Sequence, residues 1–140
     1  MADQAKLAAV LLARARDDLT AARSLLDVPV VADTIVCFHA QQAVEKSLKA
    51  ALAARGHDFP FTHDLDGLRE ACITAGLSLP TTLDEIDRLT PYAAHARYGS
   101  DDPRTVSRTK ALEIATDAVA WAAAVLSTGA VASDDEPSGQ

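Results

Sequence analysis

The segment CFHAQQAVEKSLKAALAARG, which spans Cys37–Gly56, decides the fold of this chain. Its alanine, leucine, glutamate and lysine residues favour an α-helix, and a glycine stands where such a helix would end. We therefore expect a helix from about Asp33, a candidate N-cap, to Arg55. One side of this helix carries polar residues at steps of three or four, which we call the polar stripe: His39, Gln42, Lys46 and Lys49.

Apolar residues with helical spacing recur before and after this segment. Alanine and leucine alternate at steps of four and three over residues 3–26, which predicts a first helix whose charged residues, such as Asp18, face away from the core. Further helices are predicted to start at Thr62, at Thr82–Glu85 with a capping box, and at Pro103. No segment shows the alternation of a strand, so the predicted fold is all-α, an antiparallel up-down bundle of four to five helices.

Length and charge bound the organisation of the chain. Its 140 residues suit one domain, which we place at residues 1–127. From residue 128 to residue 140 the sequence is small, polar and acidic, which predicts a disordered tail. The net charge of −7 excludes a global basic footprint for nucleic acid, although a local basic patch is still compatible with it.

Neither a membrane span nor a metal site is predicted. The apolar run LAAVLLA at residues 7–13 is too short for a transmembrane helix, and its acidic and basic flanks are wrong for a secretion signal. Cys37 and Cys72 lack zinc-like spacing, and the four histidines form no compact group with carboxylates. We expect a cytoplasmic protein with no membrane contact, metal or cofactor.

The polar stripe presents two ammonium groups, an amide and an imidazole along one helix face. This set suits an anionic partner, a phosphate-bearing ligand or an acidic helix of a second subunit. The alternative is a solvated face on which Glu45 is a near neighbour of Lys46 and Lys49.

A second candidate group follows the fourth predicted helix, in the segment around Arg97 and Tyr98. Arginine can hold a phosphate through two parallel hydrogen bonds, and tyrosine can stack on a base or donate. Alternatively, Arg97 satisfies carbonyl groups at a helix end while Tyr98 packs on the bundle. No glycine-rich phosphate loop, nucleophile elbow or supported Cys–His pair is found, so no catalytic residue is assigned.

Three motifs together resemble the HEPN domain family: FHAQQAVEKSLKAALAARG at residues 38–56, THDL at 62–65 and YAAHARYG at 92–99. The resemblance covers about residues 3–126. It implies an up-down helical bundle that is commonly dimeric, often with a minimal nucleotidyltransferase as partner, in toxin–antitoxin or defence systems. One branch of the family is a metal-independent ribonuclease, which uses an arginine followed by a histidine after four to six intervening residues. Other members are thought to bind nucleotides or to assist a nucleotidyltransferase.

The sequence departs from the ribonuclease motif. Arg97 matches the arginine, but the positions for its histidine hold Asp102, Pro103 and Arg104. His95 precedes Arg97 and could approach it only across a dimer. We therefore do not expect an enzyme, because the motif supplies no imidazole at the spacing that the general acid or base requires.

The leading hypothesis is a dimeric, non-catalytic protein that acts with a nucleotidyltransferase and binds a nucleotide or RNA through the polar stripe, Arg97 and Tyr98 in one shared cleft. A ribonuclease toxin and a structural protein-interaction module are the alternatives.

Overall fold

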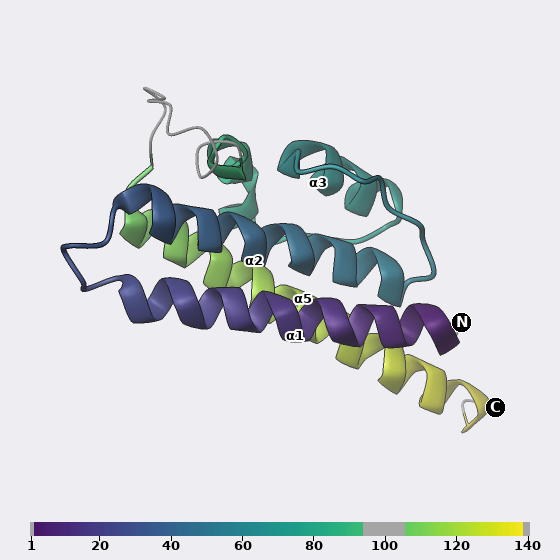
Figure 1. Ribbon diagram of the computed structural model, residues 1–140. Helices are drawn as coiled ribbons and strands as arrows, with labels where there is room; N and C mark the ends of the chain where they lie inside the picture. The colour runs from purple at the N-terminus through teal and green to yellow at the C-terminus, as the bar shows by residue number, and fades with distance from the viewer. Residues whose placement is uncertain (1, 94–105, 139–140) are drawn as a thin grey trace.

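The computed structural model describes residues 2–93 and 106–138, and every element in these ranges is helical (Figure 1). The all-α prediction is thereby confirmed. The elements in chain order are α1 (Ala2–Leu25), α2 (Asp33–Ala54), α3 (Leu65–Thr74), the 3₁₀ helix η1 (Thr81–Leu89) and α5 (Arg108–Ser138).

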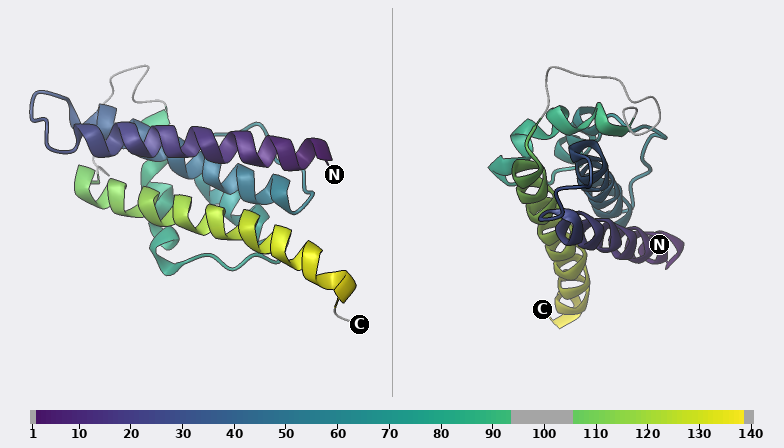
Figure 2. Two further views of the ribbon diagram at one scale, coloured as in Figure 1. Left: turned by 90° about the horizontal axis from the view of Figure 1, so that it is seen from below. Right: turned by 60° about the vertical axis from the view of Figure 1, so that its left-hand side comes forward.

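Three long helices form the body of the molecule, and the two short ones cover part of it. Helices α1 and α2 form an antiparallel hairpin, and α5 packs along both (Figures 1 and 2). Helix α5 runs in the same direction as α2, because the segment with α3 and η1 carries the chain back to the end of the bundle where α2 begins (Figure 1).

The seam between α1 and α2 is built from small side chains. Ala8, Ala15 and Ala22 recur every seven residues along α1 and are at most 1% exposed, with Leu12 and Leu19 between them. Small side chains at this spacing let two helices approach closely over several turns. The alternation of alanine and leucine in the sequence predicted this buried stripe correctly.

The predicted starts of α2 and α3 each need a correction. Asp33 is the first residue of α2 rather than its cap, because the N-cap position is taken by Ala32, which makes no side-chain hydrogen bond. Helix α3 begins at Leu65, not at Thr62: Asp64 is the N-cap and accepts from the backbone N–H of Asp66 at 3.2 Å. The end of α2 was predicted well, since Gly56 follows it with a φ of +77° that favours glycine.

The fourth helix is a 3₁₀ helix, and its predicted capping box is absent. Leu83, Ile86 and Leu89 are fully buried, and their three-residue spacing places them on one face of a helix with three residues per turn. Thr82 donates to Asp117 at 2.6 Å rather than capping the helix, and Glu85 has a non-helical backbone.

The last helix begins at Arg108, five residues after the predicted start at Pro103, which lies outside the described residues. Ser107 caps it by accepting from the N–H of Lys110 at 3.1 Å. The backbone of α5 continues to Ser138, and its last turns project past the other helices (Figure 2). The predicted disordered tail from residue 128 stays a prediction.

Within the described ranges, the segment Arg108–Thr128 is long and apolar enough to cross a membrane by length and composition. The same segment contributes Ile114, Ala115, Ala118 and Ala122 to the core, where each is fully buried. Since 39% of the apolar window is buried, packing inside the bundle accounts for part of its apolar character.

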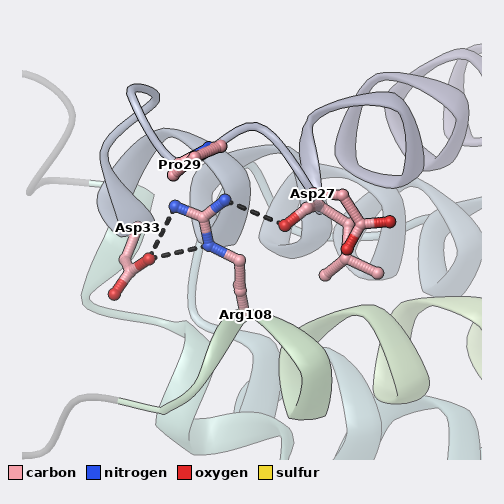
Figure 3. A pocket seen from close by; sticks show the side chains of 5 residues that line it. Asp27, Pro29, Asp33 and Arg108 are labelled. Atoms are coloured by element: carbon pink, nitrogen blue, oxygen red, sulfur yellow. Dashed lines mark hydrogen bonds and ion pairs between the residues drawn. The ribbon is translucent and has the colours of Figure 1, made fainter.

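Arg108 ties the start of α5 to the connection between α1 and α2 (Figure 3). Its guanidinium donates at 2.5–3.3 Å to four backbone carbonyl groups of this connection: Leu25, Leu26, Val28 and Val31. Its Nε also donates to the Asp33 carboxylate at 2.7 Å. Because a guanidinium has five donors in a fixed plane, one side chain holds the whole connection in place.

We expect Arg108→Ala to lower the free energy of unfolding by about 2–4 kcal/mol, because several charge-assisted hydrogen bonds are lost together. Urea unfolding followed by circular dichroism measures this loss. Arg88→Ala is the matched control, since Arg88 makes one exposed ion pair with Glu85 at 2.9 Å, and it should change stability by less than about 0.5 kcal/mol. Equal losses in the two variants would contradict the role given to Arg108.

We expect Ser47→Ala to raise the free energy of unfolding by about 0.5–1 kcal/mol. Ser47 is fully buried in α2, and its hydroxyl has no hydrogen-bond partner among the described residues. Alanine removes this unpaired group and has the higher helix propensity. Ser107→Ala should have the opposite effect, because it removes the cap of α5. A loss of stability in Ser47→Ala would mean that the hydroxyl is satisfied in solution.

Candidate functional site

Two residues of the polar stripe, Lys46 and His39, contact α1 through a single carboxylate, that of Asp18. Lys46 donates to Oδ2 of Asp18 at 2.6 Å, and the Nδ1 of His39 lies 3.1 Å from Oδ1 of the same carboxylate. The side chains of Lys46, His39 and Asp18 are 25%, 30% and 15% exposed. Asp18 thus flanks the alanine seam and bridges two stripe residues that are two helical turns apart.

The other two residues of the stripe, Lys49 and Gln42, belong to a network around a carboxylate on α2 itself, that of Glu45. Lys49 donates to Oε2 of Glu45 at 3.0 Å, and its ammonium lies 5.5 Å from the centre of the Phe59 ring. Gln41, which is fully buried, donates to Oε1 of Glu45 at 2.9 Å and accepts from Gln42 at 2.6 Å. All four stripe residues therefore have partners within the chain.

His63 completes the group around Glu45. Its Nδ1 lies 2.8 Å from Oε1 of Glu45, so the connection between α2 and α3 is fastened to the middle of α2. The motif THDL thus supplies both this contact, through His63, and the N-cap of α3, through Asp64.

The Glu45 carboxylate is charged although it is buried. Burial opposes ionisation, but hydrogen bonds from His63, Gln41 and Lys49 outweigh it, and together they hold the pKa of Glu45 below its ordinary value. A buried carboxylate with three donors is an internal ion pair with satisfied oxygens, which is the condition under which such a group is tolerated.

Four of the six expected site residues lie in the described ranges, and the structure places them in two groups. Lys46 and His39 share Asp18, and Lys49 and Gln42 are linked through Gln41 and Glu45. Arg97 and Tyr98 lie outside the described residues, so the shared cleft stays a prediction.

The sequence analysis assigned no partner role to Asp18 or His63, and it considered Glu45 only in the alternative of a solvated face. Glu45 is instead only 6% exposed. Its spacing of four residues from both Gln41 and Lys49 was the available signal for a local network. No comparable signal links Asp18 to α2, because that contact joins residues 21 and 28 positions apart.

The remaining cavities and thiols of the described residues offer little chemistry. An open cavity of about 410 Å³ lies beside Arg108, but the guanidinium is already bonded to carbonyl groups and Asp33 (Figure 3). Burial raises the pKa of Cys37 to about 11 and that of Cys72 to about 12, so both thiols are protonated and poorly nucleophilic at neutral pH. Residues 2–93 and 106–138 hold no group of three metal-ligating side chains.

Comparison with known proteins gives one finding. A family model described as the HEPN domain matches residues 8–130, from the second turn of α1 into α5. No curated protein and no solved structure is similar enough to the chain to count as a match.

We expect Glu45→Gln to lower the free energy of unfolding at pH 7 by about 3 kcal/mol, because it removes a buried charge that accepts hydrogen bonds from three side chains. The folded pKa of Glu45 lies below the unfolded value of 4.5, so its contribution is present above pH 4.5 and is lost as the pH falls through the folded pKa. The variant should therefore lose less stability than the parent protein between about pH 5 and pH 3.

The measurement is urea unfolding at a series of pH values, with Glu70→Gln as control. Glu70 is 65% exposed on α3, and the control should follow the parent curve closely. Parallel curves for Glu45→Gln and the parent protein would show that the Glu45 network does not stabilise the fold.

Proposed function

Because the chain belongs to the HEPN domain family, we propose that it is a dimeric, non-catalytic HEPN protein that acts with a nucleotidyltransferase in a toxin–antitoxin or defence-type system. In this proposal it binds a nucleotide or another phosphate-bearing ligand and works in the cytoplasm. The family supplies the setting, and the residues of this chain argue for the non-catalytic role.

The observation that carries the non-catalytic role is the histidine missing after Arg97. The three positions at the ribonuclease spacing hold an aspartate, a proline and an arginine, which cannot exchange protons near neutral pH as an imidazole does. Two of the other imidazoles, those of His39 and His63, are held by carboxylates within the chain. These contacts support a role in which the chain binds and does not cut RNA.

The candidate ligand surface is the flank of α2 that carries Lys46 and His39. Both side chains are about one quarter to one third exposed, so a ligand can reach them, and a cation beside an imidazole suits phosphate oxygens. Arg97 and Tyr98 would complete the site in this proposal.

A second candidate is a structural protein-interaction module without any small ligand. The pairing of each stripe residue within the chain favours it, since cations that already have carboxylate partners attract an external anion less strongly. This candidate predicts that removing Lys46 together with Arg97 changes neither ligand binding nor the activity of a partner.

We expect calorimetric titration of the purified protein with ATP or AMP to show binding that Lys46→Ala weakens about tenfold, as the loss of one charge-assisted hydrogen bond requires. Lys6→Ala on the exposed side of α1 is the control for net charge and should leave the affinity unchanged. In the same preparation, RNA should remain intact.

Absence of heat at millimolar nucleotide would reject the proposed nucleotide binding and would favour the second candidate, a protein-interaction module. Cleavage of RNA that Arg97→Ala abolishes would instead identify a ribonuclease toxin. Co-purification with a nucleotidyltransferase encoded beside this chain would support the proposed partner, and its failure to bind would remove that part of the proposal.

A further inference from the structure

We propose that Asp18 acts as an internal substitute for the phosphate ligand, so that the site on α2 is self-occupied until a stronger anion displaces this carboxylate. The inference rests on the proposed function, because it concerns the regulation of the same site. It makes the contact between α1 and α2 an autoinhibitory one.

The geometry of the contact is that of a bound anion. The two oxygens of Asp18 are divided between two donors, with Oδ2 on Lys46 at 2.6 Å and Oδ1 on the His39 ring at 3.1 Å. The oxygens of a phosphate group could accept from the same two donors at similar distances. Asp18 comes from another helix and so reaches the stripe from outside, as a ligand would.

Lys49 cannot serve in the same way. Its partner Glu45 is 6% exposed and is also held by Gln41 and His63, so an incoming anion would have to break a buried network. Asp18 is more accessible, with two donors and a position at the rim of the seam. His39 and Lys46 are therefore the stripe residues whose carboxylate partner can be replaced by another anion.

Displacement of Asp18 does not require α1 to leave the bundle. The helix is held by its buried alanine and leucine residues, and the Asp18 side chain lies at the edge of this apolar stripe. Rotation of the Asp18 side chain toward solvent is sufficient to free both donors. A partly exposed ion pair is weak, so its release costs an incoming anion only about a fivefold loss of affinity.

The charge of an anion decides whether it can displace Asp18 from Lys46 and His39. A carboxylate carries one negative charge, whereas the diphosphate of a nucleotide or inorganic pyrophosphate carries two or more, and it gains more from Lys46. A single carboxylate metabolite should compete poorly with Asp18. The self-occupied site therefore selects for phosphate chains.

The test is calorimetric titration of the full chain with inorganic pyrophosphate and with ATP, at one low ionic strength. The variant is Asp18→Asn, and its matched control is Asp17→Asn, which removes the same charge from an exposed neighbouring position of α1. Asp18→Ala is the second variant, in case the amide still holds Lys46. Thermal unfolding of each variant shows that it is folded.

We expect Asp18→Asn or Asp18→Ala to bind pyrophosphate at least about fivefold more tightly than the parent protein, with Asp17→Asn close to the parent. Equal binding by all four proteins would overturn the inference and leave the proposed ligand site standing. No binding by any of them would overturn both. A loss of stability in the Asp18 variants without any gain in affinity would show that the contact is structural.

Discussion

The close approach of α1 to α2 is the constraint on which the rest of the structure depends. Alanine at every seventh position of α1 leaves little side-chain volume between the two helices, and the leucines between them fill what remains. Asp18 on α1 and Lys46 on α2 meet beside this seam at 2.6 Å. A larger residue at Ala15 would therefore push the two helices apart and break the contact of Asp18 with Lys46.

Much of the bundle could be predicted from the sequence because the relevant signals are local. The α2 helix was expected at residues 33–55 and is found at Asp33–Ala54, since helix propensity and a terminal glycine both act over short distances. The start of α3 was misplaced because Thr62 and Asp64 are both good caps, and tertiary contacts choose between them. The three-residue spacing of η1 fits either an α-helix or a 3₁₀ helix, and the kink at Glu85 resolves it only in the structure.

The candidate site was less predictable, for a physical reason. The sequence shows which cations share a face of α2, but it does not show which carboxylates meet them, because Asp18 and His63 come from other elements. The polar stripe was therefore interpreted as a surface for an external anion or as a solvated face, whereas in the described residues Lys46 and Lys49 each lie against a carboxylate of the chain. The buried carboxylate of Glu45 also offsets the positive charge of Lys49.

The contacts of Arg108 have a consequence for how the chain is made. They join residues 75 to 83 positions apart, so the turn that links the first two helices is secured by the first residue of the last helix. A nascent chain leaves the ribosome from its N-terminus, so α1 and α2 can pair while Arg108 has not yet been added. During that interval the carbonyl groups of the turn must be hydrated. The turn is secured only after Arg108, the first residue of the last helix, has been added to the chain.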